Sequence, residues 1–403
     1  MAGRNKMWQQ IDRTDYVQEH FWIGEFIQSD KWSESSPPRF DPYNYPYHKD
    51  GFDFRETSYA FDNEIHVTEI IHATSWECMR SIINDGGFKS KDINYPGFGV
   101  TNFVWFGLKI GEEEIDRVRE NNKRRVQDLM QDKPLLKADR VISEITRTPV
   151  FQPPSIYGHF KFTVSIKEVL QAYKTQFCAS LGRPEIRKFG TFAYKQETMH
   201  VVLVCPPDTP GTDKCPPLSD DPVIQPDAMF ETWTWKPHST GNKYISFLPS
   251  GYPWTSNIRW EHVVFALYVP KDRCLKIRNL KNRLSLCLAT NKNGEVAGIN
   301  EDIRRMLDWV ASLGASKKKS LVNMLISMIA GYLNEERLYE KTMVKSYEQY
   351  QYVDLESVVR HLREVLPPVE LEDLNWRPLK NWMNSLTSHS NILHVIQTAG
   401  ISF

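Results

Sequence analysis

No hydrophobic run in this sequence is long enough to span a membrane. The longest, LVNMLISMIAGYL at Leu321–Leu333, is far shorter than the roughly 20 apolar residues that a membrane helix needs. The first residues, MAGRNKMWQQID, contain no apolar stretch of the kind found in cleaved signal peptides. We therefore expect an intracellular protein, in the cytoplasm or the nucleus, that makes no contact with a membrane.

The sequence also lacks an excess of charge of either sign and any closely paired cysteines. Its 403 residues include 50 Lys and Arg against 50 Asp and Glu, a balance that excludes the global basic charge typical of nucleic-acid-binding proteins but not a local patch. Six cysteines are scattered without a C-x-x-C pair, which favours reduced thiols over disulfides or zinc. Cys205 and Cys215 with distant histidines form an alternative zinc ligand set, but structural zinc sites usually show short paired spacings, so we expect no metal.

Glycine-rich phosphate-binding loops are absent too. Neither G-x-G-x-x-G nor G-x-x-x-x-G-K-[ST] occurs, which argues against dinucleotide-fold dehydrogenases and P-loop enzymes. What the sequence does contain is 41% hydrophobic and 12% aromatic residues, enough for a large core in two or three domains. The charge runs Lys123–Arg125 and Lys317–Lys319 are interpreted as solvated helix surface because aromatic residues do not interleave them.

The pattern along the chain predicts three regions. Residues 1–60 form an N-terminal segment, with amphipathic helices expected over 7–28 and a Pro- and Tyr-rich stretch behind them. Residues 61–293 form an α+β core, and the proline-dense stretch 206–228 within it is a long loop or an internal domain boundary. Residues 294–403 form a helical C-terminal domain.

Within the core, alternating apolar runs predict a split, mostly antiparallel sheet. Strands are expected in the runs GVTNFVWFGLKI, HFKFTVSI, TMHVVLVC, MFETWTW, KYISFL, EHVVFALYV and RLSLCLAT. Helices are expected in EEEIDRVRENNKRRVQDLMQ, INEDIRRMLDWVASLG and KKKSLVNMLISMIAGYLNEERL.

The stretch EIHVTEIIHATSW contains His-x-Thr twice, at His66–Thr68 and His72–Thr74. If residues 65–74 form one strand, the two histidines share a face but lie roughly 20 Å apart, so they cannot share a site. His72 precedes a helix signal with the apolar stripe Trp76, Met79, Ile82 and Ile83, ended by Gly86–Gly87. The pattern therefore places His72 at the carboxyl end of a strand, as a site residue or as a histidine hydrogen-bonded in a packed interior.

Three pieces of this region, IIHATS, SIINDGGF and FVWFGL, resemble the start of an ADP-ribosyltransferase domain of the His-Tyr-Glu type over about residues 64–205. The resemblance implies that His72 and Thr74 hold the adenosine ribose of NAD and that Trp105 or Phe106 stacks on the nicotinamide. Glu197, which opens the apolar run after YKQ, matches the catalytic position, where a carboxylate stabilises an oxocarbenium-like transition state. The implied activity is transfer of ADP-ribose from NAD to a protein or nucleic acid.

The sequence departs from this family in ways that keep other functions open. Ala73 stands where glycine or an aromatic residue is common, and the aromatic strand lacks tyrosine. A transferase-like fold that has lost catalysis and binds a protein or nucleic acid is the first alternative. The second is a two-histidine phosphoesterase, in which His72–Thr74 pairs with His238–Thr240. The oligomeric state is not predicted by any of these patterns.

Overall fold

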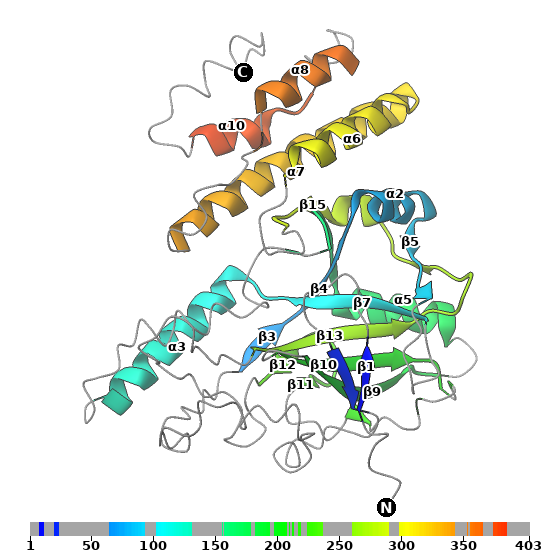
Figure 1. Cartoon of the computed structure of the whole chain (residues 1–403), viewed down its shortest axis with the longest axis vertical. Coiled ribbons are helices and arrows are strands. Elements are labelled where there is room, and N and C mark those ends of the chain that lie inside the picture. Colours follow the sequence, from blue (N-terminus) through cyan, green and yellow to red (C-terminus); the bar gives the residue numbers. More distant parts are fainter. Residues whose placement is uncertain are drawn as a thin grey trace, which may run out of the picture. The chain divides into compact units, whose positions relative to one another are not determined.

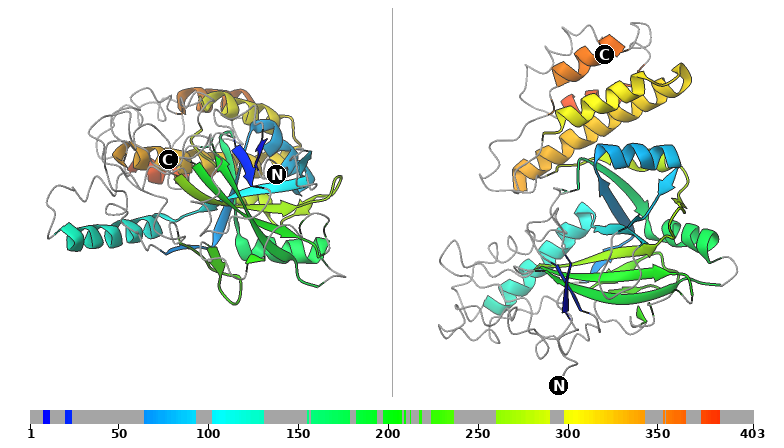
Figure 2. Two further views of the ribbon diagram at one scale, coloured as in Figure 1. Left: turned by 60° about the horizontal axis from the view of Figure 1, so that its bottom comes forward. Right: turned by 45° about the vertical axis from the view of Figure 1, so that its right-hand side comes forward.

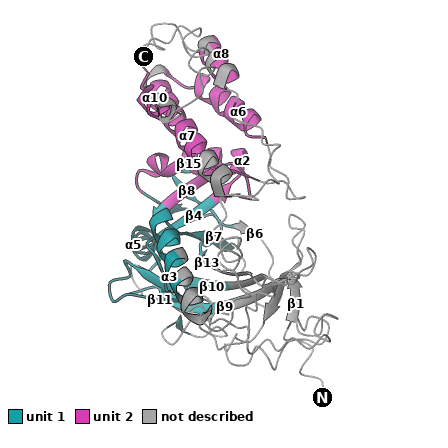
Figure 3. Cartoon of the chain, turned by 90° about the vertical axis from the view of Figure 1, so that its left-hand side faces the viewer, with its two compact units in different colours: residues 1–72, 85–152, 164–277 teal, residues 73–84, 153–163, 278–403 magenta. Residues whose placement is uncertain are grey.

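The computed structural model divides the chain into two compact units, coloured separately in Figure 3. Unit 1 comprises residues 1–72, 85–152 and 164–277, and unit 2 comprises residues 73–84, 153–163 and 278–403. The structure describes residues 8–11, 20–23, 64–92, 102–130, 155, 157–178, 182–193, 197–207, 209, 212, 217–218, 224–236, 260–289, 298–342, 353, 355–365 and 374–384. The sequence pattern placed a boundary at residue 294, whereas the second unit also gathers two internal segments of the predicted core.

Unit 1 is built on a mostly antiparallel sheet (Figures 1 and 2). Among its described strands, neighbours pair antiparallel except β10 with β13, which are parallel. The strand order is β1 (Trp8–Ile11), β2 (His20–Ile23), β9 (Glu185–Ala193), β10 (Glu197–Cys205), β13 (Trp260–Tyr268), β7 (Asn102–Lys109) and β4 (Glu69–Thr74), with β6 (Lys91–Asp92) paired to β7. The predicted α+β class with a mostly antiparallel sheet is confirmed at this level.

The first two strands correct the prediction of N-terminal helices. β1 and β2 pair as an antiparallel hairpin, with Trp8 opposite Ile23 and Ile11 opposite His20. Their sequences, WQQI and HFWI, are rich in aromatic and β-branched residues, which fit a pleated sheet. Apolar runs this short are compatible with either period, and pairing with the rest of the sheet selects the strand.

The run that contains both His-x-Thr motifs is also different from the prediction, because it is two strands rather than one. β3 (Ile65–Val67) joins β12 (Trp233–Trp235) and β11 (Ile224–Pro226) in a separate three-stranded sheet. The buried positions change phase at the break, from Ile65 and Val67 to Ile70 and Thr74. His66 is therefore exposed on the small sheet, opposite Thr234, while His72 belongs to the large sheet.

Two described helices belong to unit 1, and the sequence pattern predicted only the first of them. α3 (Glu112–Met130) follows β7, as the charged pattern predicts. α5 (Ile166–Phe177) was not predicted, although Ile166, Val169, Leu170 and Tyr173 recur at helical spacing and are buried. The hydroxyl of Tyr173 donates a hydrogen bond to the carbonyl of Tyr268, which ties α5 to β13, and burial raises the pKa of that hydroxyl.

The described part of unit 2 is mainly helical. It also contains β15 (Leu284–Leu286), which pairs antiparallel with residues 160–162 of β8 (Phe160–Ser165). Its α2 (Trp76–Asp85) buries the four predicted stripe residues and ends at Gly86, where φ is +68°. The ring of Trp76 packs against those of Phe160 and Trp309, each at 5.9 Å.

The C-terminal helices of unit 2 are α6 (Asn300–Ala311), α7 (Ala315–Thr342), α8 (Leu355–Val365) and α10 (Arg377–Asn384). α7 contacts α6, α10 and β15, and its buried residues extend from Leu321 to Leu333, so it is the central helix of this group. None of the helices in the described ranges is both long and apolar enough to cross a membrane.

Candidate functional site

The imidazole of His72 completes a cluster of three aromatic rings in unit 1. Its centroid lies 4.9 Å from that of Phe88, in β5 (Gly87–Phe88), and 5.6 Å from that of Phe106, in β7. The two phenylalanine rings lie 5.1 Å apart and are almost fully buried. The His72–Phe88 and Phe88–Phe106 pairs pack edge to face, a geometry that stabilises a ring pair by about 0.5 to 1.5 kcal/mol beyond simple burial. The half-buried histidine is therefore a packing element of the sheet.

A backbone hydrogen bond fixes the tautomer of His72. Its Nδ1 lies 2.8 Å from the carbonyl oxygen of Trp105 on the adjacent strand. A carbonyl oxygen accepts hydrogen bonds and cannot donate them, so Nδ1 carries the proton in the neutral ring and Nε2 holds the lone pair. The ring orientation is thus set by both the aromatic neighbours and the strand backbone.

Of the two aromatic candidates on β7, Phe106 contacts His72 and Trp105 does not share its face. Ile71 pairs with Gly107, so the next residue along antiparallel β4, His72, lies opposite Phe106. Trp105 is on the alternate face, where it packs against a buried cluster that includes Phe103 and Leu203. Trp105 contacts His72 through its backbone carbonyl.

Thr74 lies two residues beyond His72 on β4, within the part of that strand assigned to unit 2. Its side chain is buried, and its carbonyl is closely approached by Gly158. A Cβ at Gly158 would lie 2.5 Å from that oxygen, and the glycine has φ +131°. Both facts require glycine there and describe Thr74 as a tightly packed strand residue.

The register of the sheet separates position 197 from His72. Glu197, the first residue of β10, pairs with Trp260 on β13. His72 lies opposite Phe106, which pairs with Phe265 on β13, five residues beyond Trp260. Strands β13 and β7 lie between β10 and β4. At about 3.3 Å per residue and 4.8 Å per strand, the two Cα atoms lie roughly 20 Å apart.

Strand alternation adds to this separation. Leu203 pairs with Ala266 and Ala266 pairs with Trp105, so position 197, six residues before Leu203, belongs to the Trp105 set of positions. His72 and Phe106 belong to the other set. Of the candidates on the described sheet that the family resemblance suggested, His72 and Phe106 therefore share one face. Trp105 and position 197 belong to the other face.

The histidine in the first motif has different neighbours. Glu114 of α3 accepts a hydrogen bond from the backbone N–H of His66 at 2.5 Å and lies 3.4 Å from its Nδ1. Arg117 hydrogen-bonds the same carboxylate and the carbonyl of Glu64, and these contacts lower the pKa of Glu114 against the opposing effect of its burial. The group is a surface ion-pair network that docks α3 on β3.

Buried Cys205, at the end of β10, does not have the features of a nucleophile. Burial raises the pKa of its thiol to about 11, so the thiolate is a minor form at neutral pH.

The described cysteines are free thiols, namely Cys78, Cys178, Cys205, Cys274 and Cys287. In the ranges that the structure covers, no three His, Cys, Asp or Glu side chains are grouped so as to hold a metal. The alternative ligand Cys215 and the phosphoesterase candidates His238–Thr240 lie outside the described residues.

A polar feature that sequence patterns missed is the turn between β11 and β12. The carboxylate of Asp227 accepts hydrogen bonds from the backbone N–H groups of Met229, Glu231 and Thr232, at 2.9 to 3.1 Å. These bonds, led by that from Glu231, lower the pKa of Asp227. Met229 was predicted to open a strand, but the strand begins at Trp233, because the Asp227 side chain closes the turn first.

The same turn presents an apolar side chain to solvent. Met229 has 68% of its surface exposed, and Phe230 adopts φ +56°, which is uncommon for an aromatic residue. The Phe230 ring packs on Trp233, and Glu231 is paired with Lys167 at the start of α5. The turn is thus held by its own hydrogen bonds while the Met229 side chain remains exposed.

No family model, curated protein or solved structure matches this chain.

Proposed function

We propose that the chain is a non-catalytic binding module that recognises a protein partner. The observation that carries this proposal is the register of the unit 1 sheet. It separates position 197 from His72 by two intervening strands and by strand alternation. A transferase of the resembled type needs these groups around one NAD molecule, so this register favours binding over catalysis.

The immediate surroundings of His72 support the same conclusion. Its ring packs against Phe88 and Phe106, and its Nδ1 bonds the Trp105 carbonyl. Each of these contacts stabilises the strand, and none requires a ligand. This packing supports a structural role for the His-x-Thr motif at His72–Thr74.

The charge arrangement favours a protein partner over a nucleic acid. The sequence is neutral overall. Around the small sheet, basic groups lie beside carboxylates, as in Lys236 with Glu64, Lys167 with Glu231 and Arg117 with Glu114. Phosphate recognition depends on a net excess of basic charge, which these pairs do not provide.

The turn at residues 227–232 is the element that we assign to partner recognition. Its backbone is held by the Asp227 carboxylate and by a backbone hydrogen bond from the Asp227 N–H to the Thr232 carbonyl, 2.8 Å. Because the turn is already ordered, a partner that takes up Met229 pays little conformational entropy. The expected partner is a folded protein with an apolar pocket that fits one methionine side chain.

Site-specific photocrosslinking tests this assignment. The full chain carries p-benzoylphenylalanine at position 229, or at exposed Arg183 as the matched control, and is irradiated in a lysate of cells that express it. We expect a discrete protein adduct from position 229 that is absent from position 183 and absent when Asp227→Ala is also present. The adduct protein, once purified, should bind wild type at least about tenfold more tightly than Met229→Glu.

Two results would contradict the proposal. The first is the same set of adducts from positions 229 and 183, which would mean that the turn makes random contacts. The second is equal affinity of the purified adduct protein for wild type and Met229→Glu. Partner loss in Asp227→Ala with normal circular dichroism would locate the defect in the turn rather than in the fold.

A further inference from the structure

In unit 2, the ring of His361 lies between two carboxylates. Its Nε2 is 2.7 Å from Oδ1 of Asp308 on α6, and its Nδ1 is 3.1 Å from Oε2 of Glu364, one turn later on α8. The histidine side chain is 23% exposed. It immediately precedes Leu362, which is buried together with Val358 on the apolar face of α8. His361 thus bonds α6 beside the residues that pack α8.

The two contacts define the protonation state that the arrangement needs. An ionised carboxylate accepts hydrogen bonds and cannot donate one. Both ring nitrogens must therefore carry a proton to satisfy Asp308 and Glu364 together, and a ring with both protons is an imidazolium cation. A neutral ring satisfies one carboxylate and presents a lone pair to the other.

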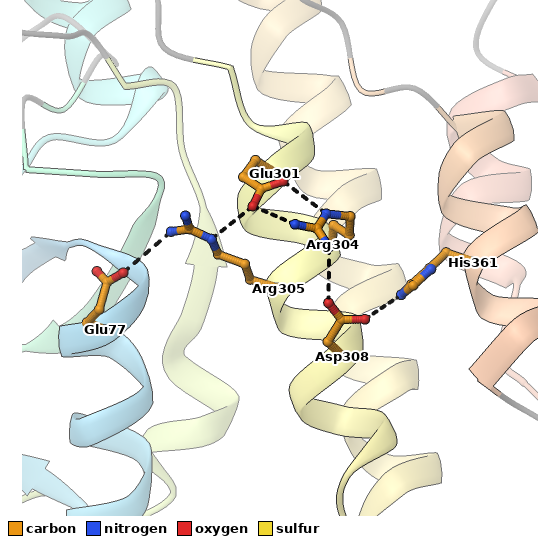
Figure 4. Close-up of polar contacts among 6 residues, drawn as sticks. All are labelled: Glu77, Glu301, Arg304, Arg305, Asp308 and His361. Carbon is orange, nitrogen blue, oxygen red and sulfur yellow. Dashed lines mark hydrogen bonds and ion pairs between the residues drawn. The ribbon is translucent and has the colours of Figure 1, made fainter.

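Asp308 belongs to a longer chain of ion pairs (Figure 4). Arg304 lies between Asp308 and Glu301, at 3.4 Å and 2.7 Å, and Arg305 lies between Glu301 and Glu77 of α2, at 3.1 Å and 3.4 Å. When His361 loses its charge, the Asp308 carboxylate keeps its ion pair with Arg304. The network is surface-exposed, so each contact is weak and adjustable.

We propose that His361 is a pH-sensitive latch that docks α8 on α6. In the protonated state it joins Asp308 to Glu364 and holds α8 against the helix group. In the neutral state it loses one contact, and α8 opens locally more often.

The direction of the pH dependence follows from which groups titrate. Among the described residues, the carboxylates that contact His361 are Asp308 from α6 and Glu364 from its own helix, and Arg304 contacts Asp308 in turn. Docking is strongest where both ring nitrogens carry a proton and both carboxylates are ionised, because only then are both contacts satisfied. It weakens when the ring loses a proton at higher pH, and it weakens when the carboxylates gain protons at acidic pH.

Hydrogen exchange followed by mass spectrometry tests the latch in the full chain. Protection factors, which correct each rate for the intrinsic effect of pH, are compared at pH 6 and pH 8 for peptides covering Leu355–Val365. We expect protection of α8 to be about threefold to fivefold higher at pH 6 in wild type. Peptides from α5 (Ile166–Phe177), in the other unit, serve as the internal reference.

Two variants separate His361 from other titrating groups, including His159, whose Nδ1 lies 2.7 Å from Asp302 on α6. His361→Gln should have the same α8 protection at both pH values. Glu364→Gln should also lose the pH dependence while keeping the helix docked, because a glutamine amide can donate to an unprotonated Nδ1. His66→Gln, which changes another exposed histidine beside a carboxylate, should behave as wild type.

Equal α8 protection at pH 6 and pH 8 in wild type would overturn the proposal. A wild-type ratio that persists in both His361→Gln and Glu364→Gln would also overturn it, since the pH dependence would then arise elsewhere on α6. The latch is independent of the proposed binding function, so neither result bears on the turn at residues 227–232.

Discussion

His72 in unit 1 and His361 in unit 2 are both partly buried, but their surroundings give the same ring opposite roles. His72 meets two phenylalanine rings and a backbone carbonyl, and its neutral form satisfies these three contacts. His361 meets two carboxylates, so its cationic form satisfies both. The role of each histidine therefore follows from the hydrogen-bond acceptors and rings that the fold places around it, and not from its local sequence motif.

The largest effect is expected where the His72–Thr74 strand is packed most tightly. Gly158→Ala should destabilise the protein by about 3 kcal/mol or more, because the added methyl meets the Thr74 carbonyl and the backbone has φ +131°. Urea unfolding followed by circular dichroism measures this loss. Gly314→Ala, where a Cβ meets no atom within 4 Å, is the matched control and should have a small effect. Equal losses would show that the close approach to Thr74 is relaxed in solution.

Replacing His72 tests whether its ring stabilises unit 1 by packing. His72→Ala should cost about 2 to 3 kcal/mol, because it removes a ring from the cluster with Phe88 and Phe106. His72→Phe should cost about half as much, since it restores a ring but leaves the Trp105 carbonyl without its donor. Urea unfolding of the three proteins gives this order. A smaller loss for alanine than for phenylalanine would contradict a packing role.

The two units should also differ in the pH range that affects them. Burial raises the pKa of the Cys205 thiol to about 11, so the folded chain retains that proton at a pH where the unfolded chain has lost it. Stability from this group is complete below about pH 9 and falls as the pH rises towards 11, by about 1 to 2 kcal/mol. Cys205→Ala should show a shallower decline in urea unfolding over this range. Identical slopes would mean that the thiolate is solvated in the folded state.

The smallest effect on the free energy of unfolding is expected when His361 is replaced. His361→Gln should change the free energy of unfolding by less than about 1 kcal/mol at pH 6, since the surface pairs are solvated and docking of α8 is a local event. Thermal unfolding at pH 6 and pH 8 checks this value. A loss comparable with that of His72→Ala would mean that His361 supports the fold rather than a local latch.

The sequence predicted those helices and strands in which buried residues recur at one regular spacing along the whole element. α2 is confirmed, with its stripe of Trp76, Met79, Ile82 and Ile83 and its end at Gly86, because both the 3.6-residue spacing and the glycine signal are visible in sequence. The strands β7, β8, β10 and β13 and the helices α3, α6 and α7 are confirmed for similar reasons. The break at Thr68 was missed, although adjacent Ile70 and Ile71 interrupt the alternation and signal a change of phase.

The candidate site was harder to predict, because it depends on contacts between distant parts of the chain. The pairing order that places β13 and β7 between β10 and β4 has no local signature in the sequence. The turn closed by Asp227 and the latch at His361 match no catalytic motif. A DAMFET turn signal could have identified the first, whereas Asp308, which defines the second, lies far from His361 in sequence.

The most direct test of the proposed binding function is an assay of nicotinamide release from labelled NAD by the purified full chain, beside Glu197→Gln and His72→Phe. We predict no release above the buffer rate in any of the three, because the sheet register keeps position 197 and His72 roughly 20 Å apart. Release by wild type that disappears in Glu197→Gln, with unfolding behaviour unchanged, would contradict the account and establish the transferase activity instead.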